Sequence, residues 1–117
     1  MTGPIPWSRW SSAALRKRRA VLVRRPPPLK AMLRGSVIER YKRCGKPGCK
    51  CMEGPGHGPK FYLSVSVPGA RPTMQYVPAE YHEQVNAFIA NFRQMRTVLE
   101  EICAINLELL RRREELE

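Results

Sequence analysis

The first half of the sequence contains almost no negative charge. Residues 1–52 carry 14 Lys and Arg side chains but one acidic side chain, Glu39, so their net charge is +13. Residues 53–117 carry 7 basic and 9 acidic side chains, which gives −2 and brings the whole chain to +11. An excess of positive charge confined to one half of a chain predicts a polyanionic partner for that half.

Aromatic residues and long apolar runs are also scarce. Aromatics make up 8% of the 117 residues, which excludes a large buried core and predicts that a metal or a second chain adds stability. The sequence lacks an apolar run of about 18 residues that could span a membrane, and lacks the apolar segment of about 7 to 15 residues of a signal peptide. We therefore expect a cytoplasmic protein, in which clustered cysteines bind metal more often than they form disulfides.

Residues 1–34 are rich in Arg, Pro and Ser and show little periodicity. This composition predicts a disordered basic tail. The alternative is a short helix from Leu15 to Val23, capped by Ser11 or Ser12 and ended by the prolines that begin at Pro26. Such a helix could contact a membrane surface, but one short basic segment anchors poorly. We favour the disordered tail on composition.

Residues 35–78 show the alternation of apolar and polar positions that is typical of strands. Strands are expected at 35–41, 61–67 and 73–77, and a turn is expected at 68–72. After Pro78 the pattern changes to a helical period, which predicts one long helix over 79–117. The expected fold is α+β, with a three-stranded antiparallel sheet, a cysteine-rich loop at one end of it, and a long C-terminal amphipathic helix.

The apolar positions of the predicted helix step alternately by three and four residues, as in a coiled-coil seam that runs on to Arg113 and Leu116. Because the far half of the helix would have nothing in its own chain to pack against, we predict self-association into a dimer or a larger bundle. The alternative is a frayed amphipathic extension beyond a near half that covers the sheet. A single Asn at an a position would fix the register of such a coil. The predicted oligomerisation residues are Phe92, Met95, Leu99, Ile102, Asn106 and Leu109.

Three cysteines and one histidine lie within fourteen residues, and the predicted ligands are Cys44, Cys49, Cys51 and His57. Tetrahedral zinc accepts a Cys3His set, and the neighbouring glycines and prolines let a short loop bring four side chains together. The spacing C-x4-C-x-C-x5-H differs from the common zinc pairs. A structural zinc would stabilise a sheet that is too small to be stable alone.

Three other roles of the cysteines stay open at this point: buried free thiols, a redox pair favoured by Lys46 and Lys50, and an iron–sulfur cluster. The fourth ligand could also be His82 or Cys103. We expect His82 to be an exposed polar residue and Cys103 to be a small apolar residue beside the helix seam.

Basic and aromatic residues alternate around the cysteines, and the predicted nucleic-acid contacts are Arg40, Tyr41, Lys42, Arg43, Lys46, Lys50 and Lys60. Tyr41, Phe61 and Tyr62 are placed to stack on bases. This mixture suits single strands or distorted duplexes, of DNA or RNA, better than groove recognition by a helix. The sequence therefore favours a nucleic-acid-binding accessory protein.

The alternative function is an interaction module in which zinc stabilises a sheet that carries an oligomerising helix. In that case the lysines near the cysteines offset thiolate charge, and the basic tail serves solubility. The sequence contains no recognisable catalytic constellation, so we expect no enzymatic activity.

The stretch Gly35 to Cys51, followed by His57-Gly58-Pro59, resembles a family of short bacterial and archaeal proteins of unknown function that are often encoded near transposases. The resemblance continues through Tyr76-Val77-Pro78 to residues 106–110. It implies that 35–110 forms the family's unit, that the basic leader lies outside it, and that the protein belongs to a mobile-element context. It implies no activity.

Overall fold

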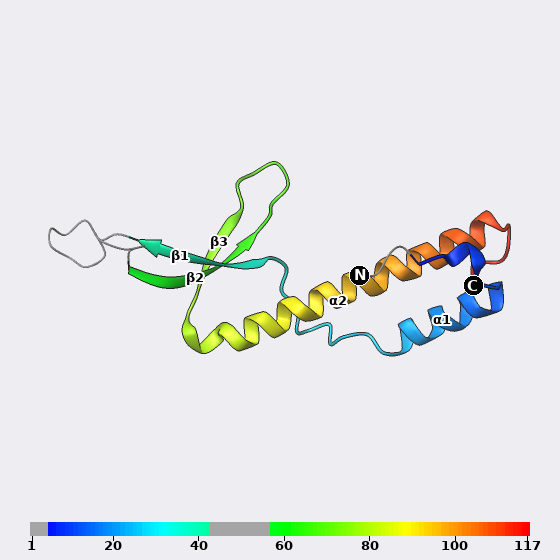
Figure 1. The fold of residues 1–117 in the computed structure, drawn as a ribbon, viewed down its shortest axis with the longest axis horizontal. Coiled ribbons are helices and arrows are strands. Elements are labelled where there is room, and N and C mark those ends of the chain that lie inside the picture. Colours follow the sequence, from blue (N-terminus) through cyan, green and yellow to red (C-terminus); the bar gives the residue numbers. More distant parts are fainter. Residues whose placement is uncertain (1–4, 43–56) are drawn as a thin grey trace, which may run out of the picture. The chain divides into compact units, whose positions relative to one another are not determined.

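The computed structural model describes residues 5–42 and 57–117 (Figure 1). The elements are, in chain order, η1 (Trp7–Arg9), α1 (Ser12–Arg24), β1 (Ser36–Lys42), β2 (His57–Val65), β3 (Thr73–Val77), η3 (Ala79–Tyr81) and α2 (His82–Arg111). The fold is α+β, as predicted. The chain forms two compact units, a helical unit of residues 1–30 and 91–117 and a sheet unit of residues 31–90, so α2 contributes to both.

The three strands form one antiparallel sheet in the order β1-β2-β3. β3 has the predicted bounds, whereas β2 begins four residues earlier than expected, at His57. Arg40 pairs with Lys60 and Lys42 with His57, so β2 holds one residue more than β1 between these pairs. Pro59 lies in this bulge, where a residue without an N–H can be tolerated in a central strand.

The turn between β2 and β3 follows from its sequence. The N–H of Ala70 donates to the carbonyl oxygen of Val67 at 3.1 Å, with Pro68 and Gly69 between them. Gly69 has a φ of +73°, which is the conformation that the third residue of a type II turn requires. On either side of the loop that contains this turn, β2 and β3 pair in the register that sets Tyr62 opposite Tyr76.

One face of the sheet packs on the start of α2. The buried side chains of this core are Leu63, Val77 and Ile89, and Phe61 and Val85 pack against them. Gly35 precedes β1 with a φ of +134°, and a Cβ at this position would lie 2.5 Å from the carbonyl oxygen of Ser64. A glycine is therefore required where the chain enters the sheet.

The prediction of a disordered tail over 1–34 is wrong for Ser12–Arg24, which forms α1. Ser11 caps the helix, because its Oγ accepts from the N–H of Ala14 at 3.1 Å. Leu15 and Leu22 are buried, and they form a core with α2 residues of the helical unit and with the two tryptophans. The partners in this core are Ile105, Leu109, Trp7, Trp10, Val98 and Ile102.

The predicted continuation of the helix to residue 117 is also wrong, because α2 ends at Arg111. The N–H of Glu114 donates to the Leu109 carbonyl at 3.0 Å, and the N–H of Arg113 donates to the Leu110 carbonyl at 2.9 Å. These two bonds form a Schellman motif, and Arg113 takes the left-handed φ of +60° that the motif needs. Arg113 and Leu116 of the predicted seam therefore lie beyond the helix.

The expectation that the far half of the C-terminal helix lacks a partner within its own chain is wrong, because α1 packs against it. Ile102 and Leu109 join the core with α1, and Asn106 Oδ1 accepts from Arg19 at 2.6 Å. Leu99 is 50% exposed. Phe92 and Met95 are half-buried. No helix within the described residues is long and apolar enough to cross a membrane.

Candidate nucleic-acid interface

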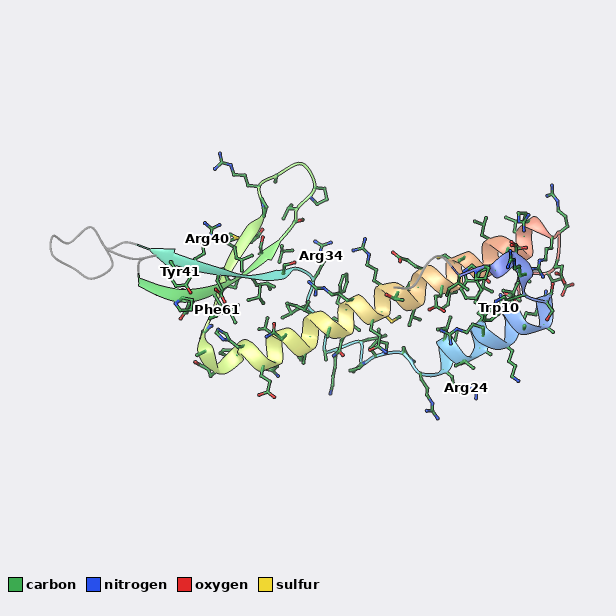
Figure 2. The ribbon with its side chains drawn as sticks, in the orientation of Figure 1. Trp10, Arg24, Arg34, Arg40, Tyr41 and Phe61 are labelled. Atoms are coloured by element: carbon green, nitrogen blue, oxygen red, sulfur yellow. The ribbon has the colours of Figure 1, made fainter. Side chains whose placement is uncertain are left out.

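The register divides the strand residues between two faces, because residues paired directly across antiparallel strands point to the same side. Val37 and Leu63 are paired on the face that packs on α2. The opposite face, called the open face below, is formed by Ser36, Ile38, Arg40, Lys60, Tyr62, Ser64, Met74 and Tyr76. In Figure 2, Arg40 and Phe61 lie on opposite sides of the strands, as this division requires.

Apolar and aromatic side chains occupy the middle of the open face. Tyr62 on β2 pairs with Tyr76 on β3, and their ring centroids are 5.7 Å apart in an edge-to-face arrangement. Tyr76 is 46% exposed and Met74 is 39% exposed, so no described element of the chain covers them. A sheet face with an exposed aromatic ring is suited to contact with flat apolar groups.

Two basic side chains lie directly opposite each other at one end of the open face. Arg40 on β1 pairs with Lys60 on β2, and both are exposed. Like charges in direct cross-strand pairs destabilise a sheet. The open face itself contains no acidic residue, and within the described part of the chain neither side chain forms an ion pair. This pair therefore favours an anionic ligand.

The structure describes only some of the other predicted nucleic-acid contacts. Tyr41 is 44% exposed at the end of β1. Lys42 ends β1, and Arg43, Lys46 and Lys50 lie outside the described residues. The prediction that Phe61 stacks on bases is wrong, because its ring packs on the covered side of the sheet at 4.4 Å from the ring of His82.

The predicted metal ligands lie mostly outside the described residues, which include neither Cys44, Cys49 nor Cys51. His57 opens β2, and its backbone pairs with Lys42, two residues before the first of these cysteines. The two ends of the cysteine-bearing connection therefore lie at neighbouring positions of β1 and β2. Among the described residues, no three His, Cys, Asp or Glu side chains gather as a metal site would need.

The two alternative candidates for the fourth metal ligand, His82 and Cys103, lie within the described residues. His82 is half-buried rather than exposed, and its Nε2 lies 2.9 Å from the carbonyl oxygen of Val77. A carbonyl oxygen can only accept, so Nε2 carries a proton in this contact and is not free to bind a metal. Cys103 was expected as an apolar filler, but it is a free and exposed thiol on α2.

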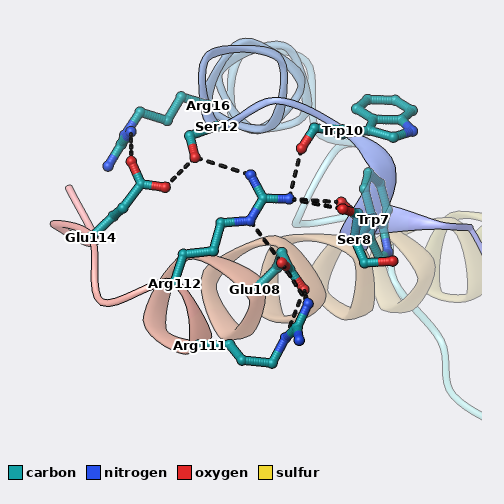
Figure 3. Close-up of polar contacts among 9 residues, drawn as sticks. All are labelled: Trp7, Ser8, Trp10, Ser12, Arg16, Glu108, Arg111, Arg112 and Glu114. Carbon is teal, nitrogen blue, oxygen red and sulfur yellow. Dashed lines mark hydrogen bonds and ion pairs between the residues drawn. The ribbon is translucent and has the colours of Figure 1, made fainter.

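In the helical unit, one guanidinium joins three segments (Figure 3). Arg112 donates to the carboxylate of Glu108 at 2.7 Å and to Ser12 Oγ at 3.0 Å. It also donates, at 2.6 to 3.3 Å, to the backbone carbonyl oxygens of Trp7, Ser8 and Trp10. Arg112 thereby holds η1 and the start of α1 on the end of α2.

Two glutamates of this network are stabilised in their charged form. The hydrogen bonds from Arg111 and then Arg112 hold the pKa of the buried Glu108 below its usual range. The pKa of Glu114 is lowered as well, chiefly by the hydrogen bond from Ser12. Both carboxylates therefore contribute to the helical unit as acceptors for charged or hydroxyl donors.

The basic block of α1 is largely engaged within the helical unit. Its ion pairs and hydrogen bonds are Arg16–Glu114 at 3.5 Å, Arg18–Glu101 at 2.9 Å and Arg19–Asn106 at 2.6 Å. Lys17 and Arg24 are exposed and have no ion pair with another described residue. Only part of the leader's charge is therefore free for a polyanion.

A comparison with protein-family models matches residues 12–87 to a domain of unknown function, DUF6788. The match spans more than half of the 117 residues. The chain belongs to the DUF6788 family. No curated protein and no solved structure matches the chain.

The DUF6788 match begins at Ser12, the first residue of α1, and ends at Ala87 in α2. It therefore takes in α1 and every residue of the open face. The resemblance seen in the sequence covers 35–110 and leaves the leader outside, whereas the family region begins with α1.

Besides two serines, sequence reasoning missed the three apolar and aromatic residues Ile38, Met74 and Tyr76 of this DUF6788 open face. Tyr76 was recognised as part of a strand and of the resemblance, but not as a neighbour of Tyr62. No local signal gives this pairing, because a two-residue turn at Pro68-Gly69 would set Gln75 opposite Tyr62, whereas Val65 pairs with Thr73 across a longer loop.

Proposed function

We propose that this DUF6788 protein binds nucleic acid through the open face of its sheet and the adjoining end of the β1–β2 hairpin. The observation that carries the proposal is the exposed cross-strand pair of Arg40 and Lys60 on a face without acidic residues. Phosphates are the anions that such a pair suits best. In view of the family resemblance, we place this accessory role in a mobile-element context.

We further propose that one structural zinc binds to Cys44, Cys49, Cys51 and His57. The pairing of His57 with Lys42 supports this set, because it brings the backbone of the histidine close to where the cysteine-bearing segment leaves β1. Bound zinc would neutralise thiolate charge and close the hairpin at the edge of a small sheet. Metal analysis of purified, reduced protein is expected to give one zinc per chain, and Cys49→Ser is expected to abolish it.

The decisive experiment for nucleic-acid binding is a charge reversal on the open face. Arg40→Glu with Lys60→Glu is compared, in the full chain and with zinc content confirmed, with Arg71→Glu and Arg93→Glu, which change the net charge equally at two other exposed arginines. The open-face variant is expected to weaken DNA and RNA binding by more than tenfold at about 50 mM salt. Its log–log salt slope should become shallower by about 1.4 to 1.8, which is two contacts at about 0.7 to 0.9 each.

Equal binding by the two double variants would attribute the affinity to general positive charge and would refute the proposed interface. The full chain is used because the leader cannot be removed without damage to the fold. Deleting residues 1–34 would remove Leu15 and Leu22 and expose Ile105 and Leu109.

A second candidate function, an interaction module that self-associates through α2, is favoured by a separate observation. Leu99, Leu107 and Leu110 are each at least 50% exposed on α2. They leave an apolar side of the helix open even though α1 covers Ile102 and Leu109. The mass of the protein in solution tests this proposal: a dimer or larger assembly that Leu99→Glu dissociates supports it, and a monomer at micromolar concentration refutes it.

A further inference from the structure

The geometry points to single-stranded nucleic acid as the ligand of the open face, with unpaired bases stacked on Tyr76 and Tyr62 and phosphates on Arg40 and Lys60. This inference rests on the proposed function and adds the class of ligand and the means of its recognition. The proposed function rests on the charges of Arg40 and Lys60, whereas the class of ligand is inferred from Tyr76 and its contact with Tyr62.

The aromatic pair provides the surface for stacking. In an edge-to-face pair, the ring that contributes its edge keeps both of its π faces free of its partner. The centroids of Tyr62 and Tyr76 are 5.7 Å apart with an angle of 64° between the rings, and nearly half of Tyr76 is exposed. Ile38, which pairs with Tyr62, and Met74 extend the apolar surface on either side. A purine or pyrimidine can therefore cover an aromatic ring that the protein itself leaves open.

The basic pair lies at the distance that one strand of nucleic acid can bridge. Lys60 and Tyr62 are two residues apart on β2 and point to the same side, which separates them by about 7 Å along the strand. Arg40 and Ile38 stand in the same relation on β1. A single chain of nucleotides lying across the sheet can thus place bases on the tyrosines and its phosphates on Arg40 and Lys60.

Duplex nucleic acid fits this surface poorly. Its bases are already stacked on one another, so their faces cannot reach a side chain that lies flat on a sheet. The phosphates of a duplex could still contact Arg40 and Lys60, but the tyrosines would add nothing to that contact. The open face is therefore selective for unpaired bases, and the selectivity depends on Tyr76 and Tyr62.

The test compares a fluorescently labelled single strand of about 20 nucleotides, as DNA and as RNA, with a duplex of the same sequence. The proteins are the full chain and the variants Tyr76→Leu, Tyr76→Phe and Tyr81→Leu, each with its zinc content and thermal unfolding measured. Tyr81 is the matched control because it is an equally exposed tyrosine, in η3 rather than on the open face.

We expect Tyr76→Leu to weaken single-strand binding about tenfold, the loss typical for one stacked base, and to leave duplex binding unchanged. Tyr76→Phe and Tyr81→Leu should bind like the parent. If Tyr76→Leu and Tyr81→Leu bind single strands equally well, or if the parent prefers the duplex, stacking on the open face is refuted while the role of Arg40 and Lys60 can still stand. If the parent binds neither ligand, the proposed function fails as well. If Tyr76→Leu proves unfolded, Tyr76→Thr replaces it, because a β-branched residue suits a strand: a tenfold loss of single-strand affinity relative to Tyr76→Phe supports stacking, and equal affinity overturns it.

Discussion

The helical unit and the sheet unit use basic side chains in opposite ways. In the helical unit, Arg112 donates to a carboxylate, a hydroxyl and three backbone carbonyls, and the basic block of α1 contacts acceptors on or after α2. In the sheet unit, Arg40 and Lys60 face each other on an exposed surface. The positive charge of the described residues is therefore partly structural, and the basic pair on the sheet is left exposed for an external anion.

This difference shows why net charge alone is a poor guide to a binding site. Removing a structural arginine should destabilise the helical unit, whereas removing an open-face basic residue should leave the stability of the fold nearly unchanged. Both tryptophans of the chain, Trp7 and Trp10, belong to the helical unit. Their fluorescence therefore reports on that unit, and amide hydrogen exchange in β1–β3 reports on the sheet.

The largest effect is expected in the core of the helical unit. Leu109 is fully buried against α1, and Leu109→Ala should lower the free energy of unfolding by about 2 to 5 kcal/mol. Leu99→Ala, on the same helix but half exposed, should cost about 1 kcal/mol or less. Urea unfolding followed by tryptophan fluorescence measures both, and equal losses would contradict the packing of α1 on α2.

The corresponding test of the sheet unit concerns two glycines with positive φ. Gly35→Ala should destabilise the sheet by about 2 kcal/mol or more, because its Cβ would lie 2.5 Å from the Ser64 carbonyl oxygen in a strained backbone. Gly69→Ala has free space around it and should cost about 1 kcal/mol, from backbone strain alone. Hydrogen exchange of the β2 amides compares them, and a larger loss for Gly69→Ala would contradict the described entry into β1.

Arg111 and Arg112 provide a matched pair for the structural use of charge. Both donate to Glu108, but only Arg112 also reaches η1 and Ser12. Arg112→Met should lower the free energy of unfolding by about 2 kcal/mol, since several carbonyl oxygens lose a charged donor. Arg111→Met, at a largely exposed side chain, should cost less than about 1 kcal/mol. Thermal unfolding followed by tryptophan fluorescence measures both variants, and equal stability of the two would contradict this role of Arg112.

The pH dependence of the helical unit follows from its two stabilised carboxylates. The pKa values of Glu108 and Glu114 are lower in the folded chain than in the unfolded chain, so their contribution is complete above the unfolded values, near pH 4.3. It should be lost as the pH falls from about 5 through the depressed folded values. Urea midpoints measured at several pH values should decline over this range for the parent and less for Glu108→Gln. An equal decline for both proteins would show that Glu108 does not contribute to the pH dependence of stability.

The smallest effect is a gain in stability. Arg113 adopts a left-handed φ of +60° at the end of α2, a conformation that glycine takes without steric cost. Arg113→Gly should therefore stabilise the helical unit by about 0.5 to 1 kcal/mol. Arg113→Ala serves as the control, because it removes the same side chain without relieving the backbone. A loss of stability in Arg113→Gly relative to Arg113→Ala would contradict the Schellman ending.

The sheet was the most predictable part of the fold, because period-two alternation and a Pro-Gly turn are local signals. β3 was predicted with its observed bounds, and the alternation over 61–67 predicted a strand that overlaps β2, although Phe61 was expected on bases and not in the core. The open face was only half recognised, since the partner of Tyr62 depends on the register between two strands.

The packing of α1 could not be derived from its own sequence. Its buried residues, Leu15 and Leu22, are only two among many basic side chains, so local composition favoured disorder. Their partners lie some ninety residues later, at Ile105 and Leu109. The periodic apolar seam of α2 predicts that something covers it, but nothing in either segment identifies α1 as the partner, and the same applies to the network around Arg112.

Backbone amide chemical shifts, mapped in the full chain during titration with single-stranded DNA, show whether the open face or the leader holds the ligand. We expect the largest changes at Arg40, Lys60, Tyr62 and Tyr76, with smaller changes at the exposed Lys17 and Arg24 of α1. Changes that are largest in α1 and absent from β1–β3 would contradict this expectation, because the ligand would then be held by the leader's charge and the open face would have no part in binding.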